Sequence, residues 1–154
     1  MIYIDTDRKE GRKMLKDSDK VSVIKRIEFI RIELEDLKEY KNLTFQEYNS
    51  NRIARRNVER IIENVANALI DISKILIANE NVDMPDSYRD IILKLGEVKI
   101  IELDLARSIS EIARLRNVLA HQYLDIKWSY IKNFLEEKVD DVYTFLNIID
   151  SYIR

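Results

Sequence analysis

One short segment of the chain combines a proton-transfer residue, a fixed positive charge and a phenolic hydroxyl. His121 is the only histidine of the 154 residues; it follows Arg116 by five positions and precedes Tyr123 by two. An imidazole can exchange protons near neutral pH, and a guanidinium can hold two oxygens of a phosphate group. The segment 116–123 therefore predicts acid–base chemistry on a phosphate ester, with His121 and Arg116 as candidate catalytic residues.

The chemistry that this segment could perform is cleavage of RNA without a metal. A neutral imidazole can take the proton from a 2′-hydroxyl, whose oxygen then attacks the adjacent phosphorus. The guanidinium would stabilise the charge on the phosphate oxygens. Asn117 could orient the imidazole of His121, because residues four apart share a helical face, and Tyr123 could bind phosphate or donate a proton. The spacing alone also fits an ordinary histidine near a helix C-terminus beside a surface arginine.

Arg116 and His121 would not converge on one phosphate from a regular helix. Five residues turn an α-helix by about 500°, which leaves the two side chains roughly 140° apart. Either the helix must loosen near its end, or a second copy of the chain must complete the site. The spacing therefore predicts a distorted helix terminus or a dimer cleft.

The composition predicts one all-α domain. Two glycines and one proline are too few to supply the turns of a many-stranded sheet, and the absence of cysteine excludes disulfides and thiolate metal sites. A net charge of −2, with acids and bases mixed, argues against a general polyanion-binding protein. No apolar run approaches the roughly 20 residues that cross a bilayer, and the N-terminus lacks the apolar centre of a signal peptide. We expect a cytoplasmic protein without a membrane partner.

Apolar periodicity predicts the elements that position this segment. We expect an antiparallel four- or five-helix bundle over residues 20–154, preceded by a polar N-terminal arm over residues 1–19. Ile30, Leu69, Ile109 and Phe145 represent the inner faces of four of these helices. The expected helices cover residues 20–41, 44–79, 86–95, 98–120 and 125–153.

Local signals predict where these helices begin, weaken and end. Asp19 and Asp125 are expected N-terminal caps, and Thr44 with Glu47 fits a capping box. Gly96 is the expected C-terminal cap of the short helix. The polar run 49–52 is the expected weak point of the second helix, because such residues compete with the backbone hydrogen bonds.

The densest basic cluster lies near the start of the second helix and consists of four arginines, Arg52, Arg55, Arg56 and Arg60. Their spacing places much of the cluster on one helical side. It could follow an RNA backbone or contact an acidic partner, or it could form salt bridges with neighbouring acids such as Glu59 and Glu63. Acidic runs such as 136–141 lack histidine partners and are interpreted as solvated surface. We expect no metal and no cofactor.

The chain resembles the HEPN superfamily and, within it, the HepT-like toxins. The resemblance is carried by an Arg-Asn-x-x-x-His-x-Tyr signature, present here as Arg116-Asn117-Val118-Leu119-Ala120-His121-Gln122-Tyr123. It extends upstream over Arg55/Arg56, Glu63, Asp71-Ile72, Pro85-Asp86-Ser87-Tyr88 and Leu95-Gly96, and covers roughly residues 20–153.

The resemblance implies the toxin of a type VII toxin–antitoxin system: a metal-independent endoribonuclease that acts as a homodimer, with His121 as the acid–base residue and Arg116 as the phosphate clamp. The implied partner is an MntA-like nucleotidyltransferase antitoxin that neutralises the toxin by AMPylation of Tyr123. We therefore expect the hydroxyl of Tyr123 to be exposed and close to the imidazole. The alternative is a catalytically silent HEPN module that binds a nucleotidyltransferase partner or nucleotide; a third reading is a helical structural dimer without a ligand.

Overall fold

The computed structural model describes residues 14–120 and 123–154, and over these ranges the chain is helical and forms no β-strand. The all-α prediction is therefore confirmed. The elements are α2 (Asp17–Leu37), the 3-10 turn η1 (Lys38–Tyr40), α3 (Phe45–Ser50), α4 (Arg52–Ala78), α5 (Tyr88–Glu97), α6 (Leu103–Ala113), α7 (Leu115–Ala120), α8 (Leu124–Asn133), the π-helical turn η2 (Phe134–Lys138) and α9 (Val139–Ile153).

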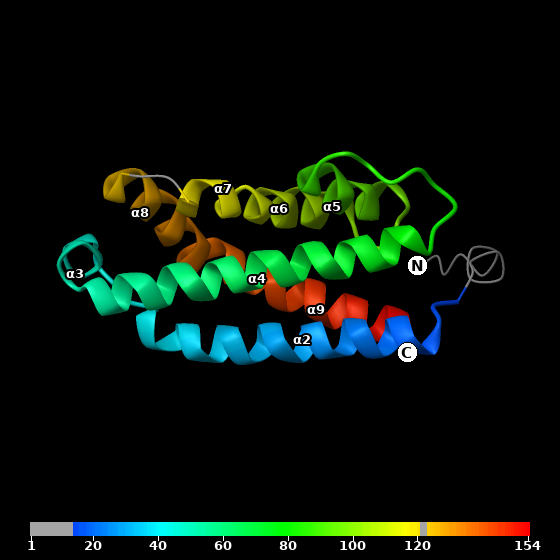
Figure 1. Ribbon diagram of the computed structural model, residues 1–154, viewed down its shortest axis with the longest axis horizontal. Helices are drawn as coiled ribbons and strands as arrows, with labels where there is room; N and C mark the ends of the chain where they lie inside the picture. The colour runs from blue at the N-terminus through cyan, green and yellow to red at the C-terminus, as the bar shows by residue number, and fades with distance from the viewer. Residues whose placement is uncertain (1–13, 121–122) are drawn as a thin grey trace, which may run out of the picture.

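The elements form an antiparallel bundle (Figure 1). α2 and α4 lie side by side along the length of the molecule, and the short helix α3 lies where the chain turns from one into the other. α5, α6 and α7 cover the opposite side of α4, and α9 contacts both α2 and α6. The motif therefore begins on one side of the bundle, which is built from the short helices α5, α6 and α7 in series.

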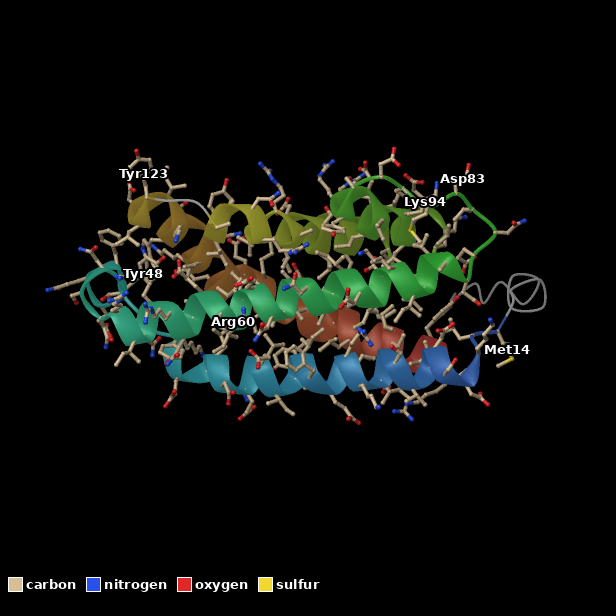
Figure 2. The ribbon with its side chains drawn as sticks, in the orientation of Figure 1. Met14, Tyr48, Arg60, Asp83, Lys94 and Tyr123 are labelled. Carbon is tan, nitrogen blue, oxygen red and sulfur yellow. The ribbon has the colours of Figure 1, made fainter. Side chains whose placement is uncertain are left out.

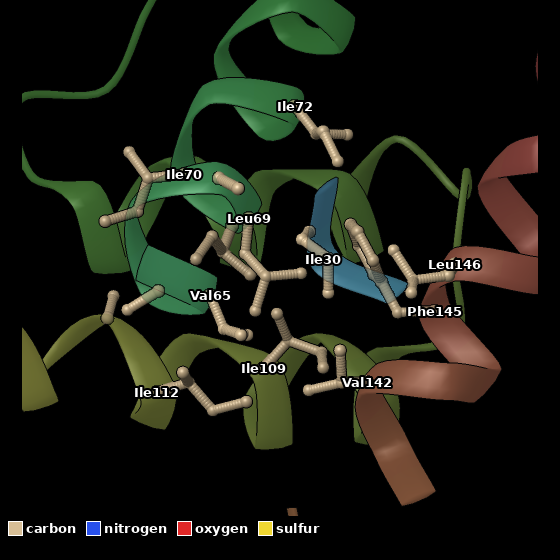
Figure 3. Close-up of a cluster of buried hydrophobic side chains, with 14 of the residues drawn as sticks. Ile30, Val65, Leu69, Ile70, Ile72, Ile109, Ile112, Val142, Phe145 and Leu146 are labelled. Carbon is tan, nitrogen blue, oxygen red and sulfur yellow. The ribbon is translucent and has the colours of Figure 1, made fainter. Parts of the chain in front are cut away.

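The core lies where α2, α4, α6 and α9 meet (Figure 3). Ile30, Leu69, Ile109 and Phe145 come one from each of these helices, and all four are fully excluded from solvent. Burial of such a side chain contributes about 1.5–3 kcal/mol to folding. The inner faces predicted from periodicity are the faces that pack.

The first helix begins earlier than predicted. α2 starts at Asp17, and the residue before it, Lys16, makes no side-chain capping bond. The prediction of Asp19 as the cap is wrong, because Asp19 already lies in the first helical turn; its charge there still favours the positive end of the helix dipole. Most of the predicted arm, residues 1–13, lies outside the described residues, so the division into arm and domain stays a prediction.

The second predicted helix is broken at the expected weak point. Thr44 caps α3, and its Oγ1 accepts a hydrogen bond from the Glu47 backbone at 3.2 Å while the hydroxyl donates to the Glu47 carboxylate at 3.0 Å. Asn51 is extended, with φ −101° and ψ 96°, and its Oδ1 accepts from the Ala54 N–H at 3.0 Å. An asparagine that caps a new helix ends the previous one, so residues 44–79 form two helices.

Gly96 does not cap the short helix, and that prediction is wrong. α5 continues through Gly96 to Glu97, and the residue with left-handed φ is Lys99, at 64°. The Lys99 N–H donates to the Gly96 carbonyl at 3.1 Å and the next N–H, of Ile100, donates to the Leu95 carbonyl at 3.0 Å, which is a Schellman arrangement. Gly96 is instead needed for close packing, because a Cβ there would lie 2.9 Å from the Cβ of Ala106 on α6.

The last two predicted helices are also divided. The helix expected over residues 98–120 begins only at Leu103 and is interrupted at Arg114, which separates α6 from α7. The helix expected over residues 125–153 begins at Leu124, with extended Tyr123 as the N-cap residue. The prediction of Asp125 as the cap is therefore wrong; Asp125 lies in the first turn.

A π-helical turn joins α8 to α9 and buries a lysine. Lys138, only 8% exposed, ends this turn. Its Nζ lies 2.6 Å from a carboxylate oxygen of Glu111 and donates to the Ser108 carbonyl at 3.2 Å. Because a buried ammonium must be paired, these contacts lock the turn against α6.

Candidate functional site

The motif begins on α7, a six-residue helix that starts directly after a turn. The turn is closed by the Arg114 N–H, which donates to the Glu111 carbonyl at 3.2 Å, and by the Asn117 N–H, which donates to the Arg114 carbonyl at 3.1 Å. Leu115 is buried and anchors α7, Arg116 is half-buried and Asn117 is exposed. Arg114 itself keeps right-handed helical dihedral angles, φ −67° and ψ −24°, so α6 and α7 are separated only by an interruption of the helical hydrogen bonding. Arg116 and Asn117 lie in the first turn after this interruption.

His121, the predicted acid–base residue, lies outside the described residues. α7 is helical to Ala120, one residue before it. The break that the structure describes therefore precedes Arg116 rather than separating Arg116 from His121. The predicted loosening of the helix between these two residues, and the predicted dimer cleft, both stay predictions.

Arg116 is held by a tyrosine from another helix. The guanidinium carbon of Arg116 lies 5.1 Å from the ring centroid of Tyr88, the first residue of α5, and Nζ of Lys74 on α4 lies 4.6 Å from the same centroid. Cations this close to an aromatic ring are attracted by its quadrupole. Lys74 and Arg116 therefore flank a common ring and are positioned by it.

The electrostatics of Tyr88 reflect this contact. A hydrogen bond with Arg116 lowers the pKa of the Tyr88 phenol, and the charges of Lys74 and Arg116 lower it further, against smaller opposing effects of desolvation and of Asp71. Asp71 in turn lies 3.6 Å from the guanidinium of Arg26 on α2. Arg26 on α2, Asp71 and Lys74 on α4, and Tyr88 on α5 thus connect α2 with Arg116 through an ion pair and contacts with one aromatic ring.

Tyr88 and Lys74 are the residues of this site that sequence reasoning did not identify. The resemblance to the HepT-like toxins includes Tyr88 but implies no role for it. Residues 74, 88 and 116 lie on three helices, so no spacing along the chain connects them. The only local signal is the position of Tyr88 directly after Ser87, whose Oγ accepts from the Asp90 N–H at 3.1 Å and caps α5.

Tyr123 is accessible, as expected. Its side chain is 69% exposed, and Figure 2 shows it at the end of the molecule, pointing away from the bundle. Its backbone is extended, and its carbonyl accepts the N–H of Lys127 at 3.1 Å as the first bond of α8. The distance from its hydroxyl to the imidazole involves His121 and stays a prediction.

The helix that follows Tyr123 is anchored by a part-buried polar and aromatic contact. Nζ of Lys127 lies 3.1 Å from a carboxylate oxygen of Glu59, which also accepts from the Tyr48 hydroxyl at 3.1 Å. The ring of Tyr48 packs against Trp128 at 5.4 Å between centroids, and the ring of Phe45 lies 6.2 Å from the same indole. These contacts hold the start of α8 against α3 and α4 while Tyr123 stays exposed.

The four clustered arginines have different surroundings. Arg55 donates to the carbonyls of Tyr48 and Asn49 at 3.1 and 3.0 Å, so it closes the C-terminal end of α3. Arg60 pairs with Glu63 at 3.7 Å. Arg52 and Arg56 are exposed and form no ion pair with the described part of the chain. The salt-bridge interpretation therefore fits Arg60, whereas Arg52 and Arg56 have no ionic partner among residues 14–120 and 123–154.

The described residues offer no metal site and no membrane-spanning helix. Within residues 14–120 and 123–154, no group of three histidine, aspartate or glutamate side chains is arranged to hold a metal ion. None of the helices in these ranges has the length and apolar character needed to cross a membrane.

Comparison with known sequences identifies a family. The chain matches the family described as "Ribonuclease HepT-like" over residues 30–149. It is 25% identical over 128 residues to a tRNA nuclease HepT of Aphanizomenon flos-aquae, covering 83% of this chain and 87% of that protein. It is 24% identical over 95 residues to an mRNA nuclease HepT of Shewanella oneidensis, covering 62% of this chain and 68% of that protein.

Solved structures share the fold. A chain in a crystal structure of a toxin–antitoxin with AMP-PNP superposes with a TM-score of 0.76 at 18% identity, over 84% of this chain and 98% of that chain. A chain in a structure of a mutant of the toxin–antitoxin MntA-HpeT superposes with a TM-score of 0.74 at 16% identity and the same coverage. The resemblance inferred from the motif is thereby confirmed, as is the expectation of a ribonuclease: the chain belongs to the HepT-like ribonuclease family.

Proposed function

We propose that this protein is the toxin of a toxin–antitoxin pair and cleaves RNA without a metal, using His121 and Arg116. The observation that carries the proposal is the geometry of α7. This short helix starts beside Arg116, leaves Asn117 exposed and ends one residue before the only histidine. Arg116 is oriented by Tyr88 without being neutralised by a carboxylate within the described residues, so its charge is available to a phosphate.

The reaction follows from the chemistry of these groups. The neutral imidazole of His121 accepts the proton of a ribose 2′-hydroxyl, and the 2′-oxygen attacks the adjacent phosphorus. The bond from phosphorus to the 5′-oxygen breaks, and that oxygen leaves as a hydroxyl after it receives a proton from water, while the imidazolium of His121 returns its proton to solvent. Arg116 stabilises the charge that gathers on the non-bridging oxygens. The products are a 2′,3′-cyclic phosphate and a 5′-hydroxyl end, and no metal takes part.

The test is RNA cleavage in EDTA by purified protein. We expect 2′,3′-cyclic phosphate ends, an about 100- to 10,000-fold loss in His121→Ala and an about 100- to 1,000-fold loss in Arg116→Ala. Arg107→Ala is the matched control, because Arg107 is exposed and pairs with Asp104 on α6 at 3.0 Å. Full cleavage by His121→Ala would overturn the acid–base assignment. Absence of cleavage by wild type, with binding to a nucleotidyltransferase retained, would favour the silent module.

The second part of the proposal concerns control of this site by a nucleotidyltransferase antitoxin that attaches AMP to Tyr123. Support comes from the 69% exposure of Tyr123 and its place two residues after His121. Attachment forms a bond from the phenolic oxygen to the α-phosphorus of ATP and releases pyrophosphate. The added phosphate carries about one negative charge, which would compete with RNA for Arg116.

Mass spectrometry after incubation with the antitoxin and ATP tests this step. We expect AMP adducts on wild type and none on Tyr123→Phe. Tyr130→Phe is the control, because it removes a phenol from α8 and leaves Tyr123 in place. Equal modification of Tyr123→Phe would refute the assignment of the acceptor residue without affecting the cleavage proposal.

We also propose that the active form is a homodimer in which the end of α7 and the start of α8 lie at the interface. Exposed apolar side chains gather at the start of α8, where Tyr123 is followed by Ile126 at 52% exposure. Sedimentation at micromolar concentration tests the assembly. We expect a dimer that Ile126→Glu weakens; a wild-type monomer that cleaves RNA would contradict this part.

A further inference from the structure

A hollow next to the motif lies between the N-terminus of α5 and the junction of α6 with α7. Its volume is about 360 Å³. Asn117 of the motif lines the hollow, and so does Tyr88, whose ring contacts Arg116. The hollow is lined by Asp86, Ser87, Tyr88, Arg89, Ala113, Arg114 and Asn117.

The charge of this hollow is positive and little compensated. Arg114 is exposed and forms no ion pair with the residues that the structure describes. Arg89 has one acidic neighbour, Asp90, at the outer limit of 4.0 Å, with both side chains more than half exposed. Such surface pairs contribute little and exchange readily for another anion. Asp86 is the only acid in the lining, so two arginines against one aspartate leave one net positive charge.

The polar groups of the lining suit phosphate oxygens. Arg114 and Asn117 are three residues apart and project from the same side of the chain, and both line the hollow. The Ser87 oxygen accepts from the Asp90 N–H, which leaves its hydroxyl proton to be donated to a ligand. Guanidinium, amide and hydroxyl donors are the groups that contact phosphates in protein–nucleic acid interfaces.

The hollow is less suited to a stacked base. Its aromatic residue, Tyr88, already has Lys74 and Arg116 over its ring. A base would have to displace one of these cations to stack there. Contacts to the sugar–phosphate backbone are therefore favoured over contacts to a base.

We infer that this hollow is a subsite that binds a backbone phosphate of the RNA strand next to the phosphate held by Arg116. Arg114 and Arg89 supply the charge, and Ser87 and Asn117 supply further donors. Because backbone contacts carry no sequence information, the subsite contributes affinity that does not depend on the base. This inference rests on the proposed function, since it takes RNA as the ligand.

The test measures RNA binding apart from cleavage. Each variant is made in a His121→Ala background, and the Kd for a fluorescent single-stranded oligouridylate is measured by anisotropy at several salt concentrations. We expect Arg114→Ala and Arg89→Ala each to weaken binding about 3- to 10-fold and to reduce the slope of log K against log salt by about 0.7. Arg114→Lys should restore most of the slope, and oligoadenylate should show the same losses.

Arg107→Ala is the matched control, because it removes one exposed charge from α6 outside the hollow. An Arg114→Ala protein that binds RNA with the affinity and slope of Arg107→Ala would overturn the subsite, even where the wild type cleaves RNA. Weakened binding of the antitoxin with unchanged RNA binding would also overturn it, because the hollow would then belong to a protein interface. A wild type that binds RNA through Arg114 but cleaves none would refute the proposed reaction and leave the subsite standing.

Discussion

The long helix α4 and the series of short helices α6, α7 and α8, called here the segmented edge, differ in what their residues do. α4 runs for 27 residues and buries a side chain at nearly every turn, from Ala54 to Ile77. α7 runs for 6 residues, and Leu115 is its only fully buried side chain. The candidate catalytic residues lie on or after α7, and none lies on the buried face of α4. α4 buries 13 of its 27 side chains, whereas α7 buries one of its six and leaves the other five at least partly accessible.

The short helix α7 needs support from other elements of the bundle. A six-residue helix is not stable by itself, because its nucleation cost is not repaid. Leu115 anchors α7, Tyr88 holds Arg116, and the Lys127–Glu59 pair holds the start of α8. The rigidity of the segmented edge is thus supplied through contacts with α3, α4 and α5.

Truncation of a core side chain on α4 should have the largest effect on folding. We expect Leu69→Ala to lower the free energy of unfolding by about 2–5 kcal/mol, because a fully buried leucine leaves a cavity. Leu119→Ala is the same truncation on α7, where the side chain is only half-buried, and it should cost clearly less. Urea unfolding measures both. Equal losses would mean that α7 is packed as firmly as α4.

Addition of a methyl group at the α5–α6 contact should have the next largest effect. We expect Gly96→Ala to destabilise the fold by about 1–2 kcal/mol, because overpacking outweighs the gain in helix propensity. The Gly96→Ala/Ala106→Gly double variant should recover part of this loss, since the two Cβ atoms would otherwise lie 2.9 Å apart. Thermal unfolding of the four proteins measures the coupling. A stabilised Gly96→Ala would show that α5 and α6 can separate at little cost.

Loss of the Tyr88 ring should affect the site and spare the core. We expect Tyr88→Leu to lower single-turnover RNA cleavage about 10-fold, equivalent to about 1.4 kcal/mol, and Tyr88→Phe to lower it less because the ring is retained. Both should unfold close to wild type, since Tyr88 is 41% exposed.

A second measurement separates this positioning role from a general loss of structure. NMR titration of the labelled phenol should show that the pKa of Tyr88 rises in Arg116→Ala, because the hydrogen bond with Arg116 is the main cause that lowers it. An unchanged titration would show that Tyr88 and Arg116 do not pair in solution, whether or not the protein cleaves RNA.

The smallest effect on stability is expected from the phenolic proton of Tyr48, whose hydroxyl donates to Glu59 beside α8. This effect appears only at alkaline pH. Burial raises the pKa of the Tyr48 phenol, and the charge and hydrogen bond of Glu59 raise it further, against a smaller opposing effect of Arg55. The folded chain thus keeps this proton at a pH where the unfolded chain, with a tyrosine pKa of about 10, loses it. This stability is complete below pH 10 and declines above it.

Chemical unfolding at pH 8 and at pH 11 tests whether stability declines as Tyr48 in the unfolded chain loses its proton. Wild type should lose more stability across this range than Tyr48→Phe, which has no phenolic proton. Lys127 pairs with the same carboxylate in both proteins, so its contribution cancels in the comparison. Equal losses would show that Tyr48 is not shielded by α8.

Local sequence was sufficient for the features that depend on neighbouring residues. The apolar faces of α2, α4, α6 and α9, the cap at Thr44 and the break near Asn51 were all predictable, because each depends on side chains within one or two turns. The motif from Arg116 to Tyr123 is contained in eight consecutive residues, so the sequence alone was sufficient to indicate the HepT-like family. The roles of its members stay predictions, since His121 lies outside the described residues.

Only the tertiary structure decided the features that join distant residues. Gly96 looked like a helix cap, but its role is set by Ala106 across the α5–α6 contact. The division of residues 98–120 into α6 and α7 places a turn at Arg114, although the apolar periodicity runs through it. The position of Arg116 depends on Tyr88 and Lys74, which lie 28 and 42 residues earlier in the sequence. Periodicity and spacing describe one helix at a time, whereas these contacts form only when separate helices pack.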